Sequence, residues 1–256
     1  MTGKTEDQMW GGRFAEPLSE AMRRFSTSLP FDRRLVRQDL AVSRAHARGL
    51  HDAGLLDTTA LGDIERGLDA IAADVDAGAF PPDGRGADAP EDIHSAVESR
   101  LLALIGDSAR RLHAGRSRND QVVTDVLLWL KDASLDVEAA VRELQRSLLA
   151  QAASNRDLVT FAYTHLQRAQ PVLLAHHLLA HVESLERDIE RLRQARERAD
   201  RCPLGSGACV GSSLPLDREA TARRLGFARV ASRRTRSMRH RIATGPSSSS
   251  RIARSS

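Results

Sequence analysis

Residues 170–200 read QPVLLAHHLLAHVESLERDIERLRQARERAD, and this stretch decides the fold. Its apolar side chains recur at spacings of three and four residues, which is the pattern of one helix face. The positions are Val172, Ala175, Leu179, Val182, Leu185, Ile189 and Leu192. Their spacing is close to a heptad seam, along which helices pack over their whole length. The stretch therefore predicts a long helix that needs a partner helix beside it.

A second pattern of this kind covers residues 117–153. At a rise of about 1.5 Å per residue, a helix of 30 or more residues spans about 45 Å, which exceeds the width of an ordinary domain. The two patterns therefore predict neighbouring long helices of an extended helical bundle.

The first hundred residues predict shorter helices. Apolar residues have helical spacing over 31–50 and again over 58–76. A further helix is expected to start at Ala89-Pro90-Glu91-Asp92, because proline is tolerated in a first turn, and to end at Gly106. No stretch alternates as a strand does. The predicted fold class is all-α, with an N-terminal helical domain at 1–110, part of a central helical bundle at 111–227 and a tail at 228–256.

The tail at 228–256 carries the excess of positive charge. It has eight arginines, eight serines and no acidic residue, whereas the whole chain has a net charge of +4. The residues before the tail are therefore net acidic, which argues against a nucleic-acid-binding protein. So few apolar residues cannot bury enough surface to offset the entropy of ordering, so the tail is predicted to be disordered.

The composition favours a cytoplasmic protein. Two cysteines, Cys202 and Cys209, cannot build a disulfide framework. No apolar run reaches the roughly 18 to 20 residues of a membrane span, and residues 1–8 lack the apolar stretch of a signal peptide. Neither a membrane nor a nucleic acid is expected as a partner.

Two short polar blocks stand at the starts of the two long patterns. Residues 115–121 read GRSRNDQ and residues 163–171 read YTHLQRAQP. In the first block, Arg116, Arg118 and Asn119 can hold a carboxylate, or they can form a solvated basic turn. In the second block, His165 is expected in a loop before a helix opened by Pro171, where an imidazole can transfer a proton near neutral pH.

Other candidates have plainer explanations. His176, His177 and His181 fall inside the predicted helix at 170–200 and are expected to be surface or packing residues, without a metal. The glycine-rich turn at 203–208 could bring backbone close to a ligand, or it could simply be the turn that separates two helices. Glu91-Asp92-Ile93-His94 is either a helix cap or a way to place His94 at a cleft.

Taken together, these blocks resemble the argininosuccinate lyase family of the fumarase/aspartase superfamily. Residues 9–14, MWGGRF, resemble its N-terminal signature, and the later blocks follow in the family's order and spacing. The blocks are 91–94, 112–122, 163–171, 203–208 and 216–219. The resemblance covers residues 9–227, about half of a family member.

The resemblance implies cleavage of argininosuccinate to arginine and fumarate by C–N elimination, without a metal or an organic cofactor. It places Thr164 and His165 at the reacting centre, with His165 on the proton-transfer side. It makes Ser28, Arg118, Asn119 and Thr164 substrate-binding residues, with His94 and Asp92 as further candidates. Family members are homotetramers whose sites join blocks from different subunits, so Asn119 is expected far from His165 within one chain.

The family pattern also calls for a second half with a mobile loop that carries the base, and no such loop occurs in this sequence. When residues 234–250 are reverse-translated, a shifted frame can read Asn-Ser-Ile-Asp-Ala, as the family would continue. We therefore hypothesise a frameshift before Arg234 and expect no turnover by the chain alone. Three function classes stay open: a lyase of arginine biosynthesis, a non-catalytic structural fragment of that family, and a nucleic-acid binder that relies on its tail.

Overall fold

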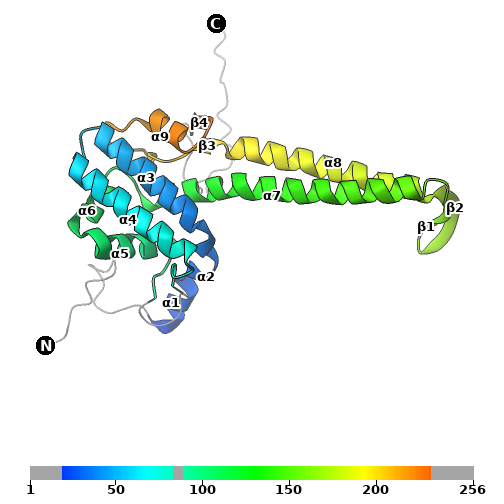
Figure 1. Ribbon diagram of the computed structural model, residues 1–256, viewed down its shortest axis with the longest axis horizontal. Coiled ribbons are helices and arrows are strands. Elements are labelled where there is room, and N and C mark those ends of the chain that lie inside the picture. The colour runs from blue at the N-terminus through cyan, green and yellow to red at the C-terminus, as the bar shows by residue number, and fades with distance from the viewer. Residues whose placement is uncertain (1–18, 83–88, 232–256) are drawn as a thin grey trace, which may run out of the picture.

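The computed structural model describes residues 19–82 and 89–231, and it shows a compact helical body from which two long helices project (Figure 1). The predicted tail from residue 232 onward lies outside the described residues. Short helices build most of the body. They are α1 (Glu20–Ser26), α2 (Leu29–Asp32), η2 (Arg33–Leu35), α3 (Val36–Asp52), α4 (Thr58–Asp76), α5 (Ile93–Ile105), α6 (Asp107–Arg110) and η3 (Arg111–His113).

The rest of the described chain forms the projection and then returns to the body. Its elements are α7 (Arg118–Ser154), β1 (Val159–Thr164), β2 (Gln167–Leu173), α8 (Leu174–Ala199), β3 (Arg201–Cys202), α9 (Arg218–Arg224) and β4 (Arg229–Val230). The fold is helical, as the sequence predicts. Neither α7 nor α8 has an apolar stretch sufficient to cross a bilayer, and the same holds for every other helix of the described residues.

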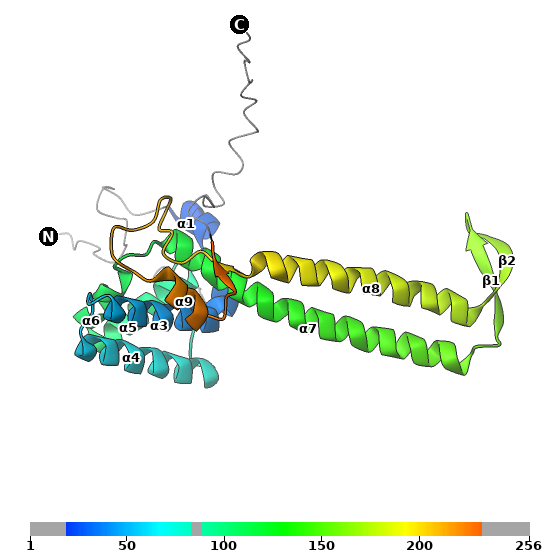
Figure 2. The same ribbon diagram turned by 90° about the horizontal axis from the view of Figure 1, so that it is seen from above.

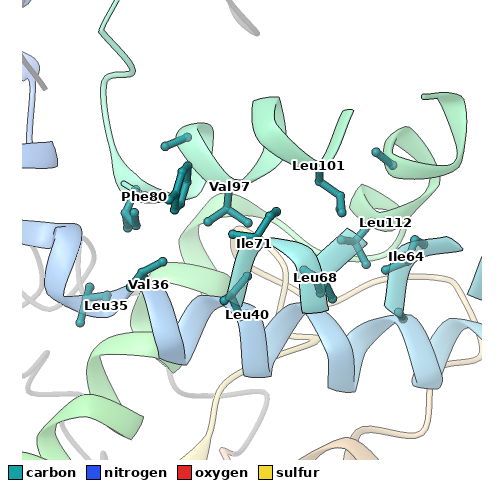
Figure 3. Close-up of a cluster of buried hydrophobic side chains, with 14 of the residues drawn as sticks. Leu35, Val36, Leu40, Ile64, Leu68, Ile71, Phe80, Val97, Leu101 and Leu112 are labelled. Carbon is teal, nitrogen blue, oxygen red and sulfur yellow. The ribbon is translucent and has the colours of Figure 1, made fainter. Parts of the chain in front are cut away.

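The hydrophobic core lies where α3, α4 and α5 pack together (Figure 3). Ile64, Leu68 and Ile71 from α4 are fully buried, and Leu40 from α3 and Leu101 from α5 pack in the same cluster. Burial of each such side chain contributes roughly 1.5 to 3 kcal/mol. The apolar spacing that predicted the helix at 58–76 is thus the spacing of its buried face.

Side-chain caps set the starts of these helices. Asp57 accepts a hydrogen bond from the amide of Ala60 at 2.8 Å, and Asp92 accepts one from Ser95 at 2.6 Å. The prediction that Pro90 lies in the first turn of its helix is wrong, because α5 begins at Ile93 with Asp92 as its N-cap. Gly106 ends that helix with a positive φ of 63°, as expected.

The helices α7 and α8 run side by side and extend away from the body (Figure 2). Polar contacts hold them together: Gln145 donates to the carbonyl of Val182 at 3.0 Å, and Arg142 pairs with Glu186 at 2.5 Å. Few apolar side chains of the pair are buried, and many are exposed. The exposed large ones are Val126, Leu135, Val137, Leu144, Leu149 and Leu179. One partner helix therefore covers only part of the predicted seam.

A β-hairpin joins the far ends of α7 and α8, where the sequence showed no strand. Strands β1 and β2 pair antiparallel, with Val159 opposite Leu173 and Thr164 opposite Gln167. The expectation that Pro171 opens the following helix is therefore wrong, since Pro171 lies in β2 and α8 begins at Leu174. Both strands are largely exposed, so no buried face imposed an apolar alternation on the sequence.

After α8 the chain returns to the body and forms a second small core. Cys202, Leu204, Ala222 and Phe227 pack there against Val42 of α3. Strand β4 pairs in parallel with β3, and Ala231 is buried. The start of the predicted disordered tail, residues 228–231, therefore belongs to the fold.

Candidate active site

The first polar block forms the N-terminal end of α7. Ser117 caps the helix, and its side chain accepts from the amide of Asn119 at 3.3 Å, while the Asp120 carboxylate accepts from the Ser117 amide at 2.8 Å. Asn119 is exposed at this end. Arg118 donates to Glu98 of α5 at 2.7 Å and to Gln121 at 3.1 Å. An amide and a guanidinium thus stand at the positive end of the helix dipole, which favours an anion.

Ser28 lies against the start of α5. Its hydroxyl donates to Asp32 at 2.5 Å, and its backbone amide donates to the carbonyl of Glu91 at 2.8 Å. The other oxygen of Asp32 accepts from the amide of Ile93 at 3.1 Å. Burial raises the pKa of Asp32, while the hydrogen bonds from Ser28 and Ile93 oppose that rise. These bonds fix Ser28 relative to the first turn of α5.

His94 does not reach solvent. Its side chain is 2% exposed, and its Nδ1 lies 3.0 Å from Asp39 of α3 and 3.2 Å from Asp125 of α7. Burial disfavours the charged imidazole, but the two carboxylates outweigh burial and raise the pKa of His94 to about 10. The alternative that placed His94 at an open cleft therefore does not describe this structure, and its neighbours are protein carboxylates.

Arg116 also points into the body. Its guanidinium donates to Ser43 of α3 at 3.2 Å, and its buried Nε has no hydrogen-bond partner. Burial lowers the pKa of Arg116, and the charge of Asp39 opposes that change. Arg116 thus faces the buried carboxylates, whereas Arg118 and Asn119 lie at the surface end of the helix.

The second polar block forms the tip of the hairpin. Thr164 ends β1 and is exposed, as is His165. His165 and Leu166 form the two-residue turn, and both have left-handed backbone, with φ of 50° and 62°. Turns of this kind normally use Asn-Gly, because side chains at positive φ cost free energy. Leu166 is 94% exposed, so no packing within the chain explains that choice.

The predicted site residues therefore fall into two groups. Ser28, Arg118 and Asn119 belong to the body: Ser28 bonds to Glu91 just before α5, and Arg118 pairs with Glu98 within α5. Thr164 and His165 lie at the opposite end of the projection (Figures 1 and 2). The 37 residues of α7 separate the groups by about 55 Å. Asn119 is thus far from His165 within one chain, as expected from sequence.

The buried polar residues between the helices of the body were not expected from the sequence. Asp39, Gln121 and Asp125 are each no more than 1% exposed, and Gln121 donates to Asp39 at 2.5 Å. Asp120 was overlooked too: it accepts from the amides of Gly205 at 2.9 Å and Gly207 at 2.7 Å. The glycine-rich turn therefore brings its backbone to a carboxylate of the chain itself. One signal in the sequence was that Gln121 and Asp125 are four residues apart, hence on one face of α7.

Comparison with known proteins places this arrangement in a family. A family model described as Lyase matches residues 12–244. The chain is 49% identical over 223 residues to an argininosuccinate lyase of Symbiobacterium thermophilum, and 46% identical over 223 residues to one of Leptothrix cholodnii. Each alignment covers 87% of this chain but 48% and 46% of the relative, so the chain spans about half the length of these proteins.

Solved structures agree with the fold. A crystal structure of EDDS lyase in complex with formate superposes with a TM-score of 0.68 at 28% identity, and covers 82% of this chain and 40% of that one. A 3-carboxy-cis,cis-muconate lactonizing enzyme of Pseudomonas putida gives a TM-score of 0.60 at 26% identity, over 84% and 48%. The helical body, the projecting pair and the sequence blocks all fit one conclusion: the chain belongs to the lyase family that includes the argininosuccinate lyases.

Proposed function

We propose that this chain supplies the N-terminal half of an argininosuccinate lyase, which cleaves argininosuccinate to arginine and fumarate in the last step of arginine biosynthesis. The reaction is an elimination. A base removes a proton beside a substrate carboxylate, the electrons collect on that carboxylate, and the C–N bond to the guanidinium breaks. The 49% identity to an argininosuccinate lyase over 223 residues supports this choice of substrate.

Each predicted site residue is assigned a role that follows from the chemistry of its side chain. We assign Ser28, Arg118 and Asn119 to substrate carboxylates, since they offer hydroxyl, guanidinium and amide donors at a helix end. Thr164 and His165 belong at the reacting centre, where an imidazole near neutral pH can move a proton to or from the guanidinium. Because carboxylates enclose His94, we assign it no direct contact with substrate.

The observation that carries the proposal is the hairpin tip. His165 is held in left-handed backbone at the exposed end of a long projection, away from other described residues of its own chain. Strained residues cost about 1 to 3 kcal/mol each and concentrate at functional sites. We propose that the tip completes a site on the body of another subunit, in a homotetramer held together by the exposed apolar faces of α7 and α8. The two unpaired cysteines favour a cytoplasmic location.

The test is a chimera. Residues 1–231 of this chain are joined to the C-terminal half of the Symbiobacterium thermophilum enzyme, and fumarate release from argininosuccinate is followed by absorbance. We expect turnover that falls at least 1000-fold in His165→Asn, with a raised KM in Arg118→Ala. His181→Asn, an exposed histidine on α8, serves as the control. A folded chimera without turnover would favour a non-catalytic structural role.

The 256-residue chain alone is expected to release no measurable fumarate. Elimination needs a base as well as an acid, and losing one member of a cooperating set removes most of the rate. The family places that base outside the region this chain matches. Fumarate release by the isolated chain that disappears in His165→Ala would contradict this expectation and point to another base.

A further inference from the structure

A buried cluster of three side chains joins the three main helices of the body. Asp39 comes from α3, His94 from α5 and Asp125 from α7, and they are 0%, 2% and 0% exposed. One ligand atom of each residue lies within 4.8 Å of the other two. Asp125 lies on α7 about two turns after Asn119. The role inferred for the cluster does not depend on the lyase reaction.

Three oxygens of this cluster lack a donor. Asp39 Oδ2 and both carboxylate oxygens of Asp125 are buried and have no hydrogen-bond partner, although Asp125 Oδ2 lies 3.2 Å from His94 Nδ1. Buried carboxylate oxygens normally have hydrogen-bond donors or coordinate an ion. Asp39 Oδ1 accepts from Gln121 and contacts His94, but its Oδ2 and both oxygens of Asp125 remain without a donor, which indicates that a further group belongs among them.

The spacing of the donors suits a metal ion. The atom pairs Asp39 Oδ1–His94 Nδ1 and Asp125 Oδ2–His94 Nδ1 are 3.0 and 3.2 Å apart. Ligands at about 2.0 to 2.2 Å from a shared zinc ion are separated by about 3.0 to 3.4 Å, depending on the coordination angle. Two carboxylates and one imidazole form a donor set that Zn²⁺ and Mn²⁺ accept.

We propose that Asp39, His94 and Asp125 bind one divalent transition-metal ion, Zn²⁺ or Mn²⁺, which joins α3, α5 and α7. A cavity of about 10 Å³ adjoins Asp39 and His94, with Gln121 and Arg116 on its other walls. That volume is about the space of one water molecule, which completes the coordination as a fourth ligand. The ion is structural, since three helices meet at it and the cavity is too small for a substrate.

Neighbouring charges limit the alternatives to two. Arg116 lies close enough to both carboxylates to interact with them, and Arg118 pairs with Glu98. With a neutral His94, the three carboxylates exceed the two guanidinium groups by one negative charge. Either a proton, on His94 or on Asp125, whose pKa burial raises well above its usual range, or a metal ion compensates that charge. In the first case the protonated cluster needs no ion, and that is the competing explanation that the experiment must distinguish.

The experiment uses the full chain with His177→Gln and His181→Gln, which removes the exposed histidine pair that could also chelate metal. We call this protein the reference variant. It is stripped with EDTA and titrated with Zn²⁺ and with Mn²⁺ in a calorimeter. We expect one ion per chain, and a melting temperature that rises with added metal, because the ion binds the folded state. Asp125→Asn in this background should weaken binding at least tenfold, whereas Asp136→Asn on the same helix should leave it unchanged.

Two results overturn the proposal. One is a folded reference variant, judged by circular dichroism, that binds neither ion; a proton within the cluster then compensates its charge. The other is an Asp125→Asn variant that binds as tightly as the reference. If Asp125→Asn does not fold, Co²⁺ added to the reference variant decides the question. Absorption bands of a nitrogen- and oxygen-ligated cobalt at one ion per chain support the site, and their absence rejects it.

Discussion

At the scale of single residues, burial gives the histidines different roles. His165 is exposed at a strained turn, whereas His94 is enclosed by two carboxylates that raise its pKa to about 10. His46 of α3 is 3% exposed, and its Nε2 donates to the carbonyl of Ala114 at 2.8 Å. Burial, reinforced by the charge of Arg116, lowers the pKa of His46 to about 3. Residue type alone would not have separated these three.

His46 should make the protein less stable as the pH falls. Above about pH 6.5 the side chain is neutral in both states and has no effect. Below about pH 6.5, His46 becomes protonated in the unfolded chain. In the folded chain it stays neutral until about pH 3. The free energy of unfolding should therefore fall by about 1.4 kcal/mol per pH unit over this window.

Urea denaturation of the wild type and of His46→Gln between pH 4 and 7 measures this slope. Glutamine keeps an N–H donor for the carbonyl of Ala114 but does not titrate, so its unfolding curve should lose that part of the pH dependence. Parallel slopes for the two proteins would show that His46 is protonated in the folded state as easily as in the unfolded one.

At the scale of elements, α4 shows how close packing depends on a missing side chain. A Cβ on Gly67 would lie 2.5 Å from Leu101 Cδ1 and 3.1 Å from Ile105 Cγ2 of α5. Leu101 is 1% exposed and cannot move into solvent without losing burial. The glycine therefore sets the separation of two core helices, although glycine within a helix costs about 1 kcal/mol relative to alanine.

Gly67→Ala should destabilise the protein by about 1 to 2 kcal/mol. Overpacking costs about 1 to 3 kcal/mol of stability, and the higher helix propensity of alanine offsets part of that cost. Gly62 on the same helix is the matched control, because its nearest contact is the end of the Arg66 side chain at 3.3 Å. Gly62→Ala should be neutral or stabilising by up to about 1 kcal/mol. Chemical denaturation measures both; a stabilising Gly67→Ala would contradict the packing argument.

At the scale of the whole molecule, the projecting helices α7 and α8 leave apolar side chains uncovered by the rest of the described chain. Val137, Leu144 and Leu179 are 49%, 49% and 42% exposed on helices whose sequence has a continuous apolar seam. Large apolar side chains exposed along paired helices indicate an interaction site. The body exposes Phe25 and Phe31 as well, but more of the exposed large apolar side chains lie on the projection, so association should depend mainly on it.

The purified chain is therefore expected to associate through α7 and α8. Light scattering coupled to size exclusion should give a mass above the 28.0 kDa of one chain. Leu144→Glu should weaken that association at least tenfold, since it removes an apolar contact and adds a charge to the interface. Glu143→Gln, one residue away, is the control. A wild-type chain that elutes as a monomer at all concentrations would refute this expectation.

The sequence by itself determined the helical fold, the two long helices and the family. Those features depend on local periodicity and capping, such as the seam from Val172 to Leu192 and the box formed by Ser117 and Asp120, which neighbouring residues encode. Only the tertiary structure revealed the hairpin and the buried cluster in which Asp39 and Asp125 enclose His94. The hairpin has no buried face to impose alternation, and Asp39, His94 and Asp125 are far apart in sequence. Contacts between distant segments depend on how the helices pack, which a local pattern does not record.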